Sequence, residues 1–187
     1  MKEKCFQIRQ ITAGWIEGII RSEQTTILFR YSYLRNFPDD LMCALLTVLG
    51  GYPAEEHRDV FRAEAEPAVA EWKLSSEGEN LRIQVRFFAD KKSDVVCSQK
   101  TAVLNKDAFL RDFVSETDAL LRRFGLLGYR LEWASEFPLS LYLKIRDIAS
   151  GQCKLSVSAL PEEENCGMVA QCSDFAAECS NLNEINR

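Results

Sequence analysis

The sequence predicts an α+β fold: an antiparallel, twisted β-sheet of six or seven strands, with two or three helices packed mainly on one face. Alternating apolar and polar residues, which are typical of half-buried strands, recur over residues 6–34 and 60–104. Apolar positions three and four residues apart, which are typical of helices, follow at 38–49, 106–124 and 138–149. We therefore expect one α+β domain over residues 1–149.

The amino-terminal third predicts three strands. Phe6 and Ile8 alternate with polar residues, GWIEGII follows, and TTILFRYSYL is a dense run of β-branched and aromatic residues. In this third run, one face would carry Ile27, Phe29, Tyr31 and Tyr33. Leu28 and Leu34 would lie on the opposite face, and apolar groups on both faces favour an interior position in the sheet.

The stretch NFPDDLMCALL predicts the first helix. Asn36 suits the N-cap, and Pro38 suits the first turn because its missing N–H is not needed there. Asp39 and Asp40 would face the positive end of the helix dipole. Adjacent side chains on a helix diverge by about 100°, so we interpret this acidic pair as a helix start and not as a catalytic pair.

The second half of the domain predicts further strands and two more helices. SSEGEN, residues 75–80, has the composition of a hairpin loop between two strands. Asn105 would cap the helix 106–124, and Gly125 would end it. A third helix would begin at Pro138 and continue to residue 149.

Residues 150–187 differ in character and predict an acidic, cysteine-containing tail. The tail holds six acids against two bases, and four of the seven cysteines. We expect it to be loosely attached to the domain or to form a short helix. The apolar face of that helix would consist of Met168, Cys172, Phe175, Ala176 and Cys179.

Composition argues against several partners. The net charge of −5 leaves the domain nearly neutral, so we expect no nucleic acid as a partner. No run approaches the roughly 20 apolar residues that span a bilayer and no secretory signal begins the chain, so we expect a cytoplasmic protein without membrane contact. The cysteines lack the short paired spacing of a zinc site, and we predict neither a metal nor another cofactor.

Two sets of residues are candidate binding sites. Arg62, Arg82 and Arg86 would lie on the polar face of the second group of strands, where acids such as Glu71 interrupt them. The second set comprises Tyr31, Tyr33 and His57, and it could line a pocket.

The strings YSYL at 31–34 and PDDL at 38–41, followed by EP at 66–67 and then Trp72, resemble a family of small bacterial cytosolic proteins without an established activity. The resemblance covers residues 25–148 and includes GYRLEW before the third helix. Met42 takes a position where the family has leucine. The resemblance implies no catalytic residue, and small bacterial proteins of this type include immunity-type antagonists of toxins.

Because no residues form a recognisable catalytic constellation, the sequence favours a non-enzymatic cytosolic protein-binding domain of immunity type, whose partner is another protein. The alternative is a small ligand-binding domain or enzyme with a pocket near Tyr31, Tyr33 and His57. A third hypothesis is association through the tail.

Overall fold

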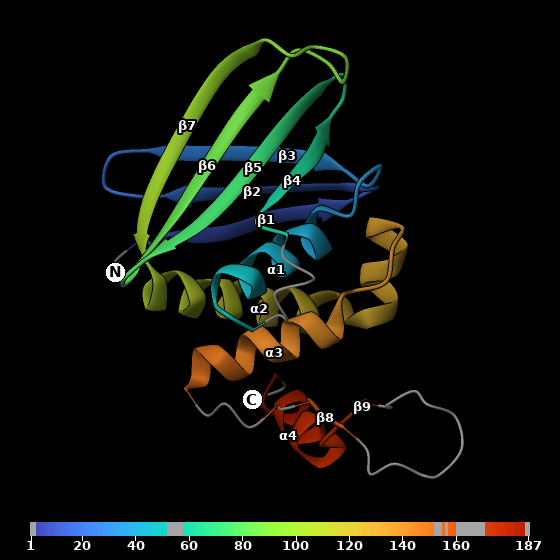
Figure 1. Ribbon diagram of the computed structural model, residues 1–187. Coiled ribbons are helices and arrows are strands. Elements are labelled where there is room, and N and C mark those ends of the chain that lie inside the picture. Colours follow the sequence, from blue (N-terminus) through green and yellow to red (C-terminus); the bar gives the residue numbers. More distant parts are fainter. Residues whose placement is uncertain (1–2, 52–57, 152–154, 156, 160–170, 186–187) are drawn as a thin grey trace, which may run out of the picture.

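The computed structural model describes residues 3–51, 58–151, 155, 157–159 and 171–185. It confirms an α+β fold made of antiparallel strands and helices (Figure 1). The prediction of one sheet with six or seven strands was wrong, because the seven long strands are divided between a three-stranded and a four-stranded sheet. Both arrangements bury the same apolar faces, so alternation along the chain does not distinguish them.

The three-stranded sheet has the order β1-β2-β3, with β1 at Phe6–Thr12, β2 at Trp15–Arg21 and β3 at Thr26–Ser32. The third strand was predicted to be interior but lies at an edge. Leu28 on its outer face is 57% exposed. The chain enters helix α1 soon after β3, and the next strand joins the other sheet, so β3 gains no second neighbour within its own sheet.

The four-stranded sheet is a meander in the order β4-β5-β6-β7. Its strands are β4 (Val60–Ala65), β5 (Ala68–Glu77), β6 (Asn80–Phe88) and β7 (Val96–Asn105). The predicted loop around Gly78 joins β5 to β6, and Gly78 has the positive φ of 59° that a tight turn requires.

An aromatic core joins the two sheets. Trp72 of β5 is fully buried, and its Nε1 donates a hydrogen bond to Tyr31 Oη of β3 at 2.9 Å. Phe37 lies with its ring centroid 4.8 Å from that of Tyr31 and 5.3 Å from that of Trp72. Because aromatic pairs at such distances prefer tilted arrangements, these rings fix how one sheet lies against the other.

The helices lie together on one side of the sheets (Figure 1). They are α1 (Phe37–Val48), α2 (Lys106–Trp133) and α3 (Leu139–Ser150). All three were predicted. The range of α2 spans two helical segments, because Gly125 (φ 62°, ψ −179°) is not helical: the first segment ends there as predicted, and a second segment, which was not predicted, continues to Trp133. Asn105 caps α2 as expected, accepting from the N–H of Ala108.

Asn36 precedes α1, but its side chain does not cap that helix. Its Oδ1 instead accepts a hydrogen bond from Trp133 Nε1 at 2.9 Å, which joins the start of α1 to the end of α2. Asp39 and Asp40 lie in the first turn, as predicted. Burial raises the pKa of Asp40, and the charge of Arg35 partly offsets this rise.

The described part of residues 150–187 contains β8 (Val157–Ala159), β9 (Gln171–Ser173) and α4 (Phe175–Ile185). A short helix was predicted here, and its expected residue Met168 lies outside the described residues. Arg146 of α3 forms an ion pair with Glu184 at 3.4 Å, and Arg122 Nη1 donates to the carbonyl oxygen of Ile185 at 3.0 Å. These contacts attach α4 to α2 and α3.

Candidate functional site

The predicted arginines Arg62 and Arg86 come together, but both are paired. Glu71 of β5 stands between them in the strand register, opposite Arg62 on β4 and Arg86 on β6. Its carboxylate accepts from Arg86 and, at 3.4 Å, from Arg62 Nε. The hydrogen bond from Arg86 is the main reason that the pKa of Glu71 is lowered. Both arginines of this triad therefore share one carboxylate, so each already has an ion-pair partner within the sheet.

Arg82 does not join this triad. It lies four residues before Arg86 on β6, and its Nε pairs with Glu77 Oε1 at 3.1 Å. The three arginines therefore form two separate ion-pair groups on one sheet face. Exposed pairs of this kind contribute only about 0.2–1 kcal/mol each.

The structure also separates the residues of the predicted pocket. Tyr31 is 1% exposed and its hydroxyl accepts from Trp72, whereas Tyr33 lies beyond the end of β3 and is 52% exposed. His57 lies outside the described residues. Tyr31 therefore has a structural role in the core, and the two tyrosines do not share a face.

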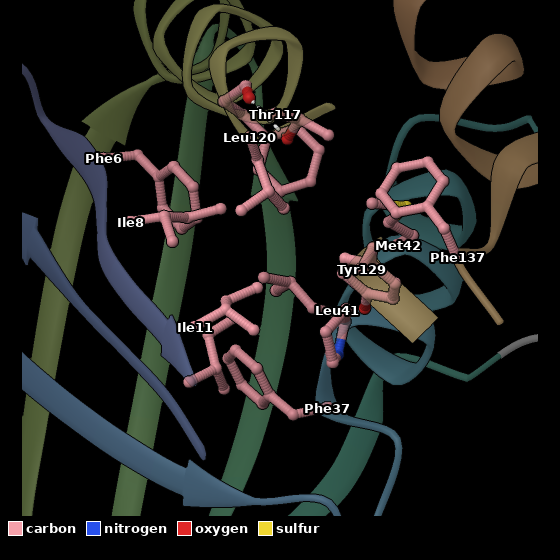
Figure 2. A pocket seen from close by; sticks show the side chains of 13 residues that line it. Phe6, Ile8, Ile11, Phe37, Leu41, Met42, Thr117, Leu120, Tyr129 and Phe137 are labelled. Atoms are coloured by element: carbon pink, nitrogen blue, oxygen red, sulfur yellow. Dashed lines mark hydrogen bonds between the residues drawn. The ribbon is translucent and has the colours of Figure 1, made fainter. Parts of the chain in front are cut away.

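A small cavity lies between β1, α1 and α2, with a volume of about 20 Å³. Figure 2 shows its lining, which is almost entirely apolar and includes Ile11, Leu41, Leu120 and Phe137. Tyr129 belongs to this lining, and its buried hydroxyl has no hydrogen-bond partner among the residues that the structure describes. The volume is sufficient for about one water molecule, so at this size the cavity is not a small-molecule pocket.

A wider hollow of about 1390 Å³ lies between the sheets and the start of α2. Its cations are largely paired: Lys4 contacts Glu116 at 2.7 Å, and Arg82 contacts Glu77. Cys5 lines the hollow, but burial and a hydrogen bond with Asp112 raise the pKa of its thiol to about 12. A thiol with such a pKa is a poor nucleophile at neutral pH, and the hollow offers no convergent reactive groups.

The most unusual surface feature is the part of α2 after Gly125. Leu127 and Leu131 lie one helical turn apart and are 79% and 83% exposed. Tyr129 and Trp133, on the buried side of the same segment, are fully buried. The segment is thus anchored by two aromatic rings while presenting leucines to solvent.

Backbone hydrogen bonds connect this segment to two neighbouring loops. The carbonyl oxygen of Glu132 accepts from Gly14 N at 2.6 Å, and the carbonyl oxygen of Gly14 accepts from Tyr33 N at 2.8 Å. A Cβ atom at Gly14 would lie only 2.6 Å from Tyr33 Cδ1, so the absence of a side chain lets this ring lie against the turn. In Figure 1 the end of α2, drawn in gold, rises beside the turn between β1 and β2.

Through Gly14, these hydrogen bonds connect the second segment of α2 to the chain at Tyr33, and both segments carry exposed apolar side chains. We call this surface the apolar corner; its members are Tyr33, Leu34, Leu126, Leu127 and Leu131, all at least 43% exposed. Single exposed leucines are common, but several exposed apolar side chains on two connected segments are typical of an interaction site.

Sequence reasoning missed this surface. It treated Gly125 as a helix end, so the following LLGYRLEW was not examined as a helix. The signal was available, because Tyr129–Trp133 and Leu127–Leu131 are two apolar pairs at four-residue spacing on different sides. A short helix cannot bury both sides unless other elements cover it.

Among the helices that the structure describes, none is long and apolar enough to cross a bilayer. The described residues also contain no group of three or more His, Cys, Asp or Glu side chains suited to holding a metal ion. Comparison with protein-family models, with characterised proteins and with solved structures found no match to this chain. The resemblance to a bacterial family therefore stays a prediction.

Proposed function

We propose that this chain is a non-enzymatic protein-binding domain and that the apolar corner is its binding surface. The observation that carries the proposal is the exposure of Leu127 and Leu131 on a helix segment whose other side is fixed by buried Tyr129 and Trp133. A rigid support lowers the entropy lost on binding, since the apolar anchors are already held in place.

The energetics favour the apolar corner over the charged sheet face. Complete burial of a leucine side chain contributes about 1.5–3 kcal/mol, so Leu127 and Leu131 together offer roughly 2–5 kcal/mol to a partner. Arg62 and Arg86 already contact Glu71. A partner that used these arginines would replace existing ion pairs with similar ones, for little net gain.

Within this proposal, the protein acts as an immunity-type antagonist of another bacterial protein in the cytoplasm. Such an antagonist inhibits by covering a surface of its target, which requires no reactive group in the antagonist itself. A rigid apolar contact suits this role because tight inhibition depends on slow dissociation.

Affinity purification from the native cells tests the proposal. Tagged wild-type protein is compared with a variant carrying Leu127→Gln and Leu131→Gln, which keeps the charge and the helix propensity of the segment. We expect one stoichiometric partner with wild type and its loss with this variant. Leu28→Gln, a change at an exposed leucine outside the apolar corner, is the matched control and should retain the partner.

A second variant, with Arg62→Gln and Arg86→Gln, examines the competing surface. If the partner is lost here and retained in the double leucine variant, the charged face is the binding surface and the proposal is wrong. Capture of no partner by wild type also contradicts it.

The antagonist role requires a functional test. The captured partner is expressed alone and together with this chain in a heterologous host. We expect growth arrest by the partner alone, rescue by wild type and no rescue by the double leucine variant. A partner that leaves growth unaffected would contradict the immunity-type role while leaving the binding function in place.

A further inference from the structure

The four-stranded sheet ends in an open edge at β7. This strand has ten residues, Val96–Asn105, and it pairs only with β6. Within the part of the chain that the structure describes, no other strand or helix forms a backbone hydrogen bond with its outer edge. The N–H and C=O groups along such an edge are able to pair with a further strand.

The edge of the three-stranded sheet at β1 is covered, in contrast. Helix α2 packs against it, and carboxylates of α2 accept hydrogen bonds from its backbone. Asp112 accepts from the N–H of Cys5 at 2.7 Å, and Glu116 accepts from the N–H of Ile8 at 3.0 Å. These bonds satisfy donors that a further strand would need, so β1 is closed to strand addition.

The open edge of β7 has few of the features that usually block strand addition. It contains no proline and is longer than most strands. Its one charged residue is Lys100, whose Nζ donates to the carbonyl oxygen of Thr26 in the other sheet at 2.9 Å. A bulge lies only at the start of the strand, opposite Phe87 and Phe88. The rest of the edge is therefore available to a partner strand.

The surroundings of β7 suit a second copy of the same strand. The turn between β2 and β3 projects beyond β7 (Figure 1). The wide hollow lies between this turn, at Ser22 and Glu23, and the second half of β7, at Thr101 and Val103. Residues 96–100, in the first half of β7, are all exposed. In an antiparallel pair about a two-fold axis, the first half of each strand lies beside the second half of the other, and so over its turn and hollow.

The register of this self-pairing follows from the charge on β7. The regular pairing of β7 with β6 runs from Ser98 to Asn105. A two-fold axis at Thr101, near the middle of this part, places Lys100 opposite Ala102 of the second copy. The two Lys100 side chains then do not lie directly opposite each other, which is the arrangement that would destabilise the pair.

The charges beyond the ends of β7 also permit the pairing. Lys92 and Asp94 precede the strand, and Lys106 and Asp107 follow it. Antiparallel pairing brings the start of one strand to the end of the other, where each of these charges meets one of opposite sign. No block of like charge opposes the second copy.

On these grounds we infer that β7 pairs with β7 of a second copy, antiparallel about a two-fold axis at Thr101. The dimer joins two four-stranded sheets into one continuous sheet. In Figure 1, β7 lies at the left and the end of α2 lies at the right. The dimer therefore leaves the apolar corner free and does not depend on the proposed function.

Analytical ultracentrifugation of the full chain over about a hundredfold range of concentration tests the inference. We expect the mass to rise with concentration from that of one chain, 21.3 kDa, to twice this value. Thr101→Glu and Thr101→Lys each place like charges opposite each other at the axis, and each should raise the dimer dissociation constant about fivefold. An equal mixture of the two variants should dimerise at least as tightly as wild type, because it places opposite charges at the axis. This recovery also shows that both variants fold.

Gln84→Glu is the matched control. Gln84 pairs with Thr101 across β6 and β7, so this change adds the same charge one strand away from the edge. It should leave the dissociation constant unchanged within about twofold. A single-chain mass at every concentration would overturn the inference. A dimer that Thr101→Glu weakens no more than Gln84→Glu does would also overturn it. A dimer that only Leu127→Gln with Leu131→Gln abolishes would place the contact at the apolar corner and would be equally contrary to it.

Discussion

Replacing Tyr31 by phenylalanine tests whether this tyrosine is structural, as the core indicates, or part of a ligand site. The change removes one oxygen from a fully packed interior and leaves Trp72 Nε1 without its partner at 2.9 Å. A buried donor without a partner costs about 1–3 kcal/mol, whereas the lost volume is negligible. We expect the free energy of unfolding to fall by about 2 kcal/mol, which moves the urea midpoint by roughly 1 M.

The matched control is Tyr33→Phe, because Tyr33 is exposed and its hydroxyl makes no described hydrogen bond. Its cost should stay within about 0.5 kcal/mol. A double-mutant cycle with Trp72→Phe should give a coupling energy above about 0.5 kcal/mol, since the two side chains share one hydrogen bond. If Tyr31→Phe costs no more than Tyr33→Phe, the bond between the sheets does not stabilise the fold and this reasoning fails.

Three further predictions concern the sheet face and the end of α2. Glu71→Gln should lower the free energy of unfolding by about 1 kcal/mol above pH 5. Because the pKa of Glu71 is lowered in the folded state, its contribution is present above the unfolded pKa and is lost as pH falls through the folded pKa. Urea unfolding should therefore show a smaller difference between wild type and variant at pH 3 than at pH 7. Gly125→Ala should lower the free energy of unfolding by about 1–3 kcal/mol, because φ 62° with ψ −179° is a conformation available almost only to glycine. An unchanged midpoint of thermal unfolding would contradict this prediction. Leu127→Gln with Leu131→Gln should change stability by less than about 0.5 kcal/mol in urea, and a larger loss would mean that these leucines are part of the core.

The sequence was sufficient for most local structure. Period-two alternation located the strands, and the N-cap Asn105 with the apolar spacing that follows located the start of α2. These features depend on neighbouring residues, so they can be read along the chain. Gly78 is another local case, because a tight turn demands its positive φ.

The division into two sheets could not be read in this way. Whether β3 pairs with β4 depends on where α1 places the chain after Phe37, and that is decided by packing of Phe37 against Tyr31 and Trp72. A strand with apolar groups on both faces suits the middle of a sheet, yet β3 lies at an edge with Leu28 exposed. Local pattern alone does not reveal such a tertiary choice.

The candidate site was predicted only in part. Arg62 and Arg86 do lie together, but the sequence could not show that both contact Glu71. The apolar corner depends on the hydrogen bonds of Gly14 to Glu132 and Tyr33, and the first of these joins segments that are more than a hundred residues apart. Surfaces formed by distant loops are visible only after the chain has been folded.

Hydrogen–deuterium exchange of the protein, free and with its captured partner, tests the central claim most directly. We expect the partner to slow exchange at residues 126–133, at the β1–β2 turn and at residues 33–35, while β4, β5 and β6 exchange as in the free protein. Protection confined to β4, β5 and β6, with residues 126–133 unchanged, would show that the partner binds the charged sheet face and would contradict the account.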